Sequence, residues 1–287
     1  MPRVRRSSLR PLALRSLVLV LSASLVLVAT KHRFASLFVP TELRQAQSLL
    51  WVTAHPDDES FFFAPSILNL LGPPHTAEGA LLCLSVGNHE GLGETRRQEL
   101  GESCRALGIR RERCTALDLP TLPDDPTVWW EVDAVEQAVR KHLEAWEVDA
   151  VITFDDYGVS GHANHRALSS ALRCVLSVFA ETLSLTSERL SRSALARSDP
   201  SFPRVFAVQS TSVLAKYTSL LLLPFTLLQR VWPSSSRSRD ALFVNSLAQY
   251  RATRRSFDAH QSQAVWFRSL FVSFSRYLWW VELRRVV

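Results

Sequence analysis

Residues 49–60 have the sequence LLWVTAHPDDES, in which a short apolar run is followed at once by an imidazole and three carboxylates. The run Leu49–Thr53 has the composition of a buried β-strand. Adjacent carboxylates repel each other unless solvent or a cation neutralises them, and folding alone does not require such a cluster. The segment therefore predicts a divalent-metal site with a spare carboxylate at the end of a strand, with a solvated acidic turn as the alternative.

Similar apolar runs recur along the chain and alternate with longer helical patterns. Besides 49–53, we expect strands at 80–86, 114–119, 150–154 and 204–209, and helices at about 60–71, 94–107, 128–146 and 165–183. This alternation predicts an α/β fold with a Rossmann-like, mostly parallel sheet and helices on both faces. Ligands of such sheets bind outside the carboxyl ends of the strands, and the polar clusters at 55–58, 88–90 and 155–165 follow predicted strands.

A second cluster of candidate ligands lies in residues 155–165, DDYGVSGHANH, where His162 and His165 are three positions apart. A His–Asp pair from the first loop and one His from the second supply three ligands and leave a fourth position for water, the pattern of catalytic zinc. The remaining carboxylate is then a candidate general base, and the remaining His a general acid or oxyanion donor. Spacing alone does not decide whether Asp57 or Asp58 binds the metal.

The motifs AHPDDES at 54–60 and GVSGHANH at 158–165 are similar to those of the LmbE-like deacetylase family. Three further stretches resemble its eukaryotic membrane-bound branch, of the phosphatidylinositol-glycan class L type: SVGN leading to GLGETRRQEL at 85–100, FD at 154–155 before GVSG at 158–161, and HQSQAVWFR at 260–268. The resemblance spans residues 48–277. AHPDD marks the wide family, whereas the stretch at 260–268 points to the branch that acts on a glycolipid.

The resemblance implies a role for each candidate site residue. It implies a divalent metal, most simply Zn²⁺, held by His55, Asp58 and His165, with Asp57 as general base and His162 as general acid. It also implies substrate binding by Arg96, Asn88 and His260. The implied reaction is hydrolysis of the acetamide of N-acetylglucosaminyl-phosphatidylinositol to the glucosaminyl lipid and acetate, in the synthesis of glycosylphosphatidylinositol (GPI) anchors.

One short stretch departs from the family pattern. Between Asn88 and Gly91 the chain has His89 and Glu90, where a small residue and an Asp are expected. Glu90 can take the place of the expected Asp. His89 is either a loop side chain or an additional metal ligand.

Length and charge limit the class of protein. The chain has 287 residues, 47% of them hydrophobic, with 9 Gly, 14 Pro and 4 Cys, which excludes collagen-like, low-complexity and disulfide-scaffold proteins. The net charge of +6 is unevenly spread: residues 46–165 carry 8 basic and 20 acidic side chains, whereas residues 230–287 carry 10 Arg and 3 acids. Basic ends beside apolar segments suit a membrane better than a nucleic acid.

The chain divides into three predicted parts. Residues 1–33 form a basic N-terminus and membrane anchor, with a cleaved signal peptide as the alternative. Residues 46–212 form the catalytic α/β domain. Residues 213–287 form a membrane-proximal apolar segment and a basic, aromatic C-terminal region that completes the fold.

Two stretches of the C-terminal part are candidates for membrane contact. The apolar stretch 214–228 fits either an interfacial hairpin or a buried helix. Residues 265–281 interleave aromatic side chains with Arg268 and Arg276, which predicts contact with a bilayer surface and its headgroups; a helix that simply packs on the sheet is the alternative.

The cysteines and the topology complete the predictions. Cys83, Cys104, Cys114 and Cys174 have no metal-finger spacing, so we expect buried reduced thiols, with a disulfide pair or a zinc role as the alternatives. The resemblance implies a single N-terminal anchor in the endoplasmic reticulum membrane and a cytoplasmic catalytic domain, although the arginines near the N-terminus favour the opposite orientation. We adopt the first orientation; the absence of an N-glycosylation sequon and of a disulfide framework in the sequence agrees with it. Protein partners are not indicated.

Two other functions fit part of the sequence. A metal-dependent de-N-acetylase of another GlcNAc conjugate shares the motifs but does not account for the membrane segment. A non-catalytic accessory subunit of a membrane complex is a different class, and it is disfavoured because all five metal and acid–base candidates are present.

Overall fold

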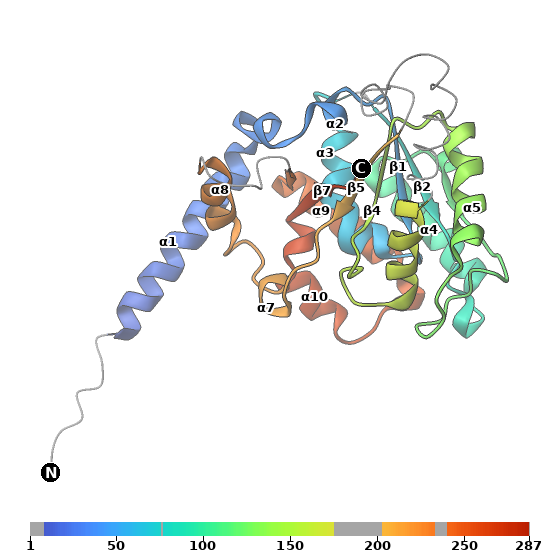
Figure 1. Ribbon diagram of the computed structural model, residues 1–287. Helices are drawn as coiled ribbons and strands as arrows, with labels where there is room; N and C mark the ends of the chain where they lie inside the picture. The colour runs from blue at the N-terminus through green and yellow to red at the C-terminus, as the bar shows by residue number, and fades with distance from the viewer. Residues whose placement is uncertain (1–8, 76, 175–202, 233–239, 287) are drawn as a thin grey trace, which may run out of the picture.

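A seven-stranded sheet forms the centre of the computed structural model, which describes residues 9–75, 77–174, 203–232 and 240–286 (Figure 1). The strand order is β3-β2-β1-β4-β5-β7-β6. β1 to β5 are mutually parallel, and β7 runs antiparallel to both β5 and β6. The strands are β1 (Ser48–Thr53), β2 (Glu78–Cys83), β3 (Cys114–Ala116), β4 (Ala150–Phe154), β5 (Arg204–Val208), β6 (Ala241–Val244) and β7 (Trp280–Arg285).

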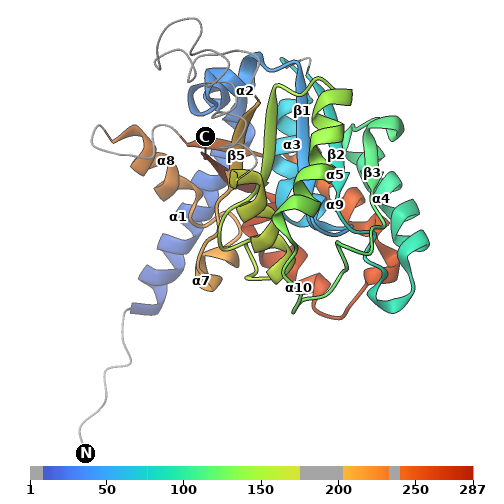
Figure 2. The ribbon, with the colours of Figure 1, turned by 45° about the vertical axis from the view of Figure 1, so that its right-hand side comes forward.

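Helices cover both faces of the sheet, which confirms the predicted fold class. Figure 2 shows α5 in front of the strands, with α3 and α9 behind them. Both faces are therefore dry, and all residues of β1 and β4 are buried. The α-helices are α1 (Leu9–Thr30), α2 (Thr41–Gln45), α3 (Ala64–Leu70), α4 (Gly93–Leu107), α5 (Val132–Ala145), α7 (Val213–Lys216), α8 (Leu223–Val231), α9 (Leu247–Ala259) and α10 (Arg268–Phe274).

Several predicted elements differ from the observed ones at their ends. The helix expected at 60–71 consists of a π-helical turn, η3 (Glu59–Phe63), followed by α3. The helix expected at 128–146 begins only at Val132. Residues 163–174 are helical, and the rest of the helix expected to reach residue 183 lies outside the described residues.

The last part of the chain completes the sheet, and its expected role at a bilayer surface is wrong for residues 275–281. β7 inserts between β5 and β6, so Tyr277 and Trp280 are fully buried. The guanidinium groups expected to meet lipid headgroups lie inside the protein as well: Arg276 pairs with Glu282 at 3.0 Å, and Arg268 donates to the carbonyl oxygen of Phe257 at 2.8 Å. Interleaved arginines and aromatic rings here mark internal cation–π packing, with the Arg276 guanidinium 3.5 Å from the Trp280 ring centre.

α1 extends beside the globular part of the protein (Figure 1) and is the one helix in the described residues long and apolar enough to cross a membrane. The candidate span is Ala13–Arg33, of which 11% is buried. Ser24 Oγ donates to the carbonyl oxygen of Leu220 at 2.8 Å, and Lys31 Nζ donates to that of Val244 at 2.7 Å. α1 is therefore attached to the globular part through its second half.

The expectation of four buried reduced thiols is wrong at three positions. Cys104, near the end of α4, forms a disulfide with Cys114, the first residue of β3. Cys174 is exposed, and only Cys83 is a buried thiol. The fold brings Cys104 and Cys114 together because α4 returns the chain along the sheet to the start of β3.

Candidate metal and catalytic site

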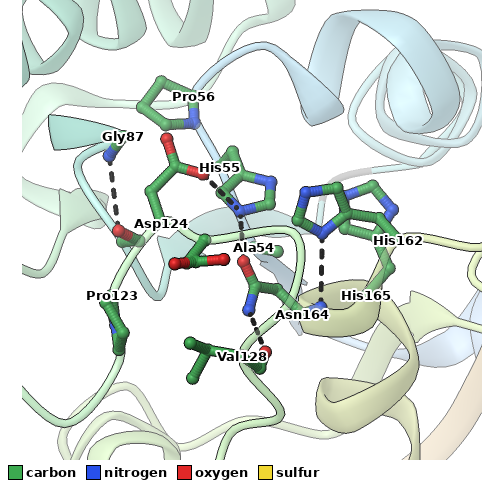
Figure 3. Close-up of polar contacts among 12 residues, drawn as sticks. Ala54, His55, Pro56, Gly87, Pro123, Asp124, Val128, His162, Asn164 and His165 are labelled. Carbon is green, nitrogen blue, oxygen red and sulfur yellow. Dashed lines mark hydrogen bonds and ion pairs between the residues drawn. The ribbon is translucent and has the colours of Figure 1, made fainter. Parts of the chain in front are cut away.

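Four loops that leave neighbouring parallel strands meet at the carboxyl edge of the sheet, where we expected the site. They follow β1, β2, β3 and β4, and they place the side chains drawn in Figure 3 around one point. The loop after β4 is the most constrained. Asp155 Oδ1 accepts from Gly158 N at 3.0 Å, and Asp155 Oδ2 accepts from Ser210 N at 2.6 Å. Gly158 has φ 67°, and a Cβ there would lie 2.6 Å from His165 Cβ, so glycine lets this loop approach His165.

Asp58 and His165 face each other across this edge. Asp58 Oδ2 accepts hydrogen bonds from the backbone N–H groups of Ala54 and His55, at 3.0 and 2.9 Å. Its other oxygen, Oδ1, lies 3.2 Å from His165 Nε2. His165 Nδ1 donates to the carbonyl oxygen of Gly158 at 2.9 Å, which directs the Nε2 lone pair toward Asp58. Two lone-pair atoms at this distance require a cation between them.

A proton can serve as that cation when no metal is bound. Although burial opposes protonation, the Asp58 carboxylate raises the pKa of His165 above its usual value. Burial works to raise the pKa of Asp58, but His165 outweighs it and lowers that pKa. A divalent metal would replace this proton, so both groups fit the predicted role of ligands.

His55 is oriented by two side chains that the sequence did not single out. Its Nε2–H donates to Asn164 Oδ1 at 2.9 Å and lies 3.2 Å from Asp124 Oδ1 (Figure 3). Because both partners are acceptors, Nε2 carries the hydrogen and Nδ1 keeps a lone pair for a ligand. Asp124 lies in the loop after β3, so its position at the carboxyl edge was the available signal. Asn164 lies inside the GVSGHANH motif.

The imidazoles of His55, His162 and His165 each offer a nitrogen within 4.8 Å of the others. With Asp58 beside His165, the structure thus brings all the predicted ligands together and places His162 next to them. Imidazole nitrogens and a carboxylate are the donors that zinc prefers. The residues present therefore fit a divalent transition metal.

His162 is held in its neutral form. Asn164 N–H donates to its Nδ1 at 3.2 Å, so in the neutral ring Nε2 carries the proton. Burial, together with the nearby His55 and His165, lowers the pKa of His162 to about 4. His162 is thus a hydrogen-bond donor at Nε2 before any charge develops on a substrate.

Asp57 occupies a strained backbone conformation, with φ 114°. Hydrogen bonds on both sides hold it there: its N–H donates to Glu59 Oε2 at 3.0 Å, and its carbonyl oxygen accepts from the N–H groups of Ser60 and Phe61 at 3.0 Å. Burial, with the adjacent Asp58 carboxylate, raises the pKa of Asp57 to about 8. A metal cation at the site would lower that pKa and favour the basic form.

Arg96 and Asn88 lie on the β2 side of the site. Arg96 Nη1 donates to the carbonyl oxygen of Gly87 at 2.7 Å and lies 3.4 Å from Asp124 Oδ2, so Asp124 bridges Arg96 and His55. The Nε of Arg96 is buried and has no hydrogen-bond partner within the described part of the chain. Asn88 Oδ1 accepts from Gly93 N at 2.9 Å at the start of α4.

The two residues that depart from the family pattern lie in the same loop and are exposed. Glu90 Oε2 lies 3.3 Å from Arg96 Nη2, where it can serve as the acid expected there. His89 does not belong to the group of possible metal ligands found among the described residues.

His260 is placed behind the site rather than in it. It is completely buried, and its Nε2 lies 2.6 Å from Glu59 Oε1. Neighbouring residues of the same segment contact a site loop and α4: Gln263 Nε2 donates to the carbonyl oxygen of Pro56 at 2.8 Å, and Ser262 Oγ donates to Glu99 Oε2 at 2.6 Å. The stretch 260–268 thus supports the loop after β1 instead of presenting His260 to a substrate.

Comparisons with known proteins agree with this architecture. N,N'-diacetylchitobiose deacetylase from Pyrococcus horikoshii superposes with a TM-score of 0.56 at 15% identity, covering 90% of this chain and 92% of that one. The fold is therefore that of the LmbE-like proteins.

The sequence comparisons are more specific. A family model described as "PIG-L: GlcNAc-PI de-N-acetylase" matches residues 50–176. N-acetylglucosaminyl-phosphatidylinositol de-N-acetylase of Bos taurus is 40% identical over 232 residues, which are 80% of this chain and 79% of that protein. The Saccharomyces cerevisiae protein of the same name is 32% identical over 256 residues, covering 82% of this chain and 77% of that one. The chain belongs to the GlcNAc-PI de-N-acetylase family.

Proposed function

We propose that this protein hydrolyses the acetamide of N-acetylglucosaminyl-phosphatidylinositol to glucosaminyl-phosphatidylinositol and acetate, an early step of GPI-anchor synthesis. One observation carries the proposal. His55 and Asp58 from one loop, with Asp57 next to Asp58 in the chain, meet His162 and His165 from another loop, in a chain 40% identical to a relative that bears the name of this activity.

The metal in this proposal is Zn²⁺, held by His55, Asp58 and His165. When bound, it supplies a Lewis acid that polarises the acetamide carbonyl and acidifies a water molecule. Asp57 accepts the proton of the attacking water as the new C–O bond forms at the carbonyl carbon. His162 donates a hydrogen bond from Nε2 to the tetrahedral intermediate, and the proton that Asp57 took from the water passes to the leaving nitrogen as the C–N bond breaks. Arg96 uses its buried Nε–H to orient the substrate.

Acetate release is the direct test. Membranes that contain the full chain are assayed with N-acetylglucosaminyl-phosphatidylinositol, with and without a chelator, beside membranes that contain the Asp57→Asn variant. We expect activity in the unmodified protein alone and its loss in both other samples. If the zinc-loaded wild type releases no acetate, this substrate is wrong.

The location in this proposal is the endoplasmic reticulum membrane, with α1 as the single anchor and the catalytic domain on the cytoplasmic side. The helix Ala13–Arg33 supports the anchor. The Cys104–Cys114 disulfide removes one argument for the cytoplasmic side, because disulfides persist mainly in oxidising compartments. A glycosylation reporter fused after Val287 decides the orientation: we expect it to stay unmodified, and its glycosylation would place the domain in the lumen.

A further inference from the structure

The globular part has an exposed apolar surface next to the candidate site. On α7, Val213 and Leu214 are 70% and 84% exposed, and around α10, Trp266 is 82% exposed. Phe267, Leu270 and Phe274 are about half exposed. We call these six residues the apolar rim. Soluble proteins rarely leave such a group of large apolar side chains in water without a partner.

The two halves of the apolar rim are joined. Ser219 N, just after α7, donates to the carbonyl oxygen of Phe274 at 2.8 Å, and the rings of Tyr217 and Phe271 are 6.2 Å apart. Figures 1 and 2 both show α7 and α10 at the end of the globular part that lies toward the N-terminus of α1. The rim is therefore one surface. It lies on the side of the globular part toward which the N-terminal half of α1 extends.

The apolar rim is also connected to the candidate site. Lys216 Nζ, at the end of α7, donates to the carbonyl oxygen of Val159 at 2.8 Å, in the loop that precedes His162. Gln263, just before Trp266 in the chain, contacts Pro56 in the loop that carries Asp57. A partner seated on the rim thus lies beside the carboxyl edge of the sheet.

Charge distinguishes this surface from the rest of the domain. Residues 211–232 and 260–281 contain no Asp or Glu, whereas residues 46–165 contain 20. Segments that carry no carboxylates of their own add no repulsion toward anionic lipid headgroups. Tryptophan at the edge of an apolar surface is typical of the interface between lipid and water.

We propose that the apolar rim inserts into the same leaflet that α1 enters, so that the bilayer itself presents a lipid-linked substrate to the site. This inference rests on the proposed function, because a lipid substrate is what makes such a position useful. The occupant is a lipid bilayer. The apolar rim is continuous with α1, because Ser24 of α1 is hydrogen-bonded to Leu220, beside α8. This continuity favours a bilayer over a protein partner. The rim acts through apolar side chains, because Arg268 and Arg276 are buried.

The test uses the full chain reconstituted in vesicles of phosphatidylcholine and phosphatidylinositol with brominated acyl chains, which quench nearby tryptophan. The fluorescence of the wild type minus that of Trp266→Phe isolates Trp266. We expect strong quenching of this difference signal in brominated vesicles and none in detergent without bromine. An unquenched Trp266 would overturn the proposal and leave a protein partner as the occupant.

A second arm measures acetate release from N-acetylglucosaminyl-phosphatidylinositol in vesicles and from its water-soluble deacylated analogue. We expect Trp266→Ser/Leu270→Ser to lose about tenfold on the vesicle substrate and little on the soluble one, because only the former requires insertion. Leu37→Ser is the matched control: Leu37 is 77% exposed but lies beyond the far end of α1. Equal losses on both substrates would contradict insertion of the rim. A wild type that is inactive although its Trp266 is quenched would contradict only the proposed substrate.

Discussion

His260 Nε2 lies 2.6 Å from Glu59 Oε1, and both side chains are completely buried. The other oxygen of Glu59 accepts the backbone N–H of Asp57 at 3.0 Å. A residue near the C-terminus thus holds, through one carboxylate, the strained backbone of the candidate general base. A buried carboxylate without a partner would be costly, so Glu59 and His260 are held together in one arrangement.

This arrangement predicts that His260 acts as a positioning residue. His260→Ala should lower kcat by about 10- to 100-fold, a size typical of residues that orient an active group, while KM and bound zinc stay within about twofold. His260→Gln should recover part of kcat, because its amide N–H can still donate to Glu59. The measurement is steady-state kinetics with metal analysis. A raised KM at unchanged kcat would instead support the substrate contact that the sequence predicted.

The proposed metal ligands can be separated from the proposed acid–base groups by metal content. Alanine variants of His55, Asp58 and His165 should each lose most of the bound zinc, whereas His162→Ala should keep it and lose activity. The measurement is elemental analysis of purified protein after dialysis against a weak chelator. If His162→Ala loses zinc as completely as the other three, the three imidazoles form the binding set.

Asp124 should matter because it bridges His55 and Arg96. Asp124→Asn removes the negative charge between these two groups and is expected to reduce kcat/KM by about tenfold or more. The neighbouring Asp125 is the matched control: its carboxylate accepts hydrogen bonds from Thr127, and within the described part of the chain it forms no hydrogen bond or ion pair with His55 or Arg96. Asp125→Asn should leave kcat/KM unchanged, and equal effects of the two variants would contradict the bridging role.

Glu282 should contribute to stability in a pH-dependent way. It lies between Arg230 and Arg276, at 2.9 and 3.0 Å. Burial works to raise its pKa, but Arg276 and then Arg230 outweigh burial and lower it. Glu282→Gln leaves two buried guanidinium groups without their carboxylate and should lower the free energy of unfolding by about 3–5 kcal/mol at neutral pH.

The sign of the pH effect follows from that lowered pKa. The contribution of Glu282 is fully present above the unfolded-state pKa, near 4.3, and is lost as the pH falls through the lower folded-state pKa. Denaturation of wild type and Glu282→Gln in detergent, followed from neutral pH to about pH 3, should therefore show a shrinking difference. Glu112→Gln, at an exposed ion pair with Arg110, should match the wild type throughout. A difference that is constant with pH would contradict the charged state of Glu282.

Local sequence determined the parallel half of the sheet and most of the site. β1, β2, β4 and β5 are short apolar runs bounded by turns, and a fully buried parallel strand needs little more than that pattern. The carboxyl ends of parallel strands share one edge, so the sequence placed the loops at 55–58 and 155–165 at the same edge of the sheet, and the pairing of β1 with β4 makes them neighbours there. His55, Asp58, His162 and His165 came together for this reason.

Only the tertiary structure decided which groups surround those residues. Asp124 contacts His55, His260 contacts Glu59 across 201 positions, and Cys104 meets Cys114 between a helix and a strand. None of these contacts has a local pattern, because each depends on how separate elements pack. The aromatic C-terminal stretch was misassigned in part for the same reason: its composition is equally suited to lipid and to a protein core. Pairing of β7 with β5 and β6 buries Trp280 and Arg276, while Trp266, a few residues earlier, remains exposed.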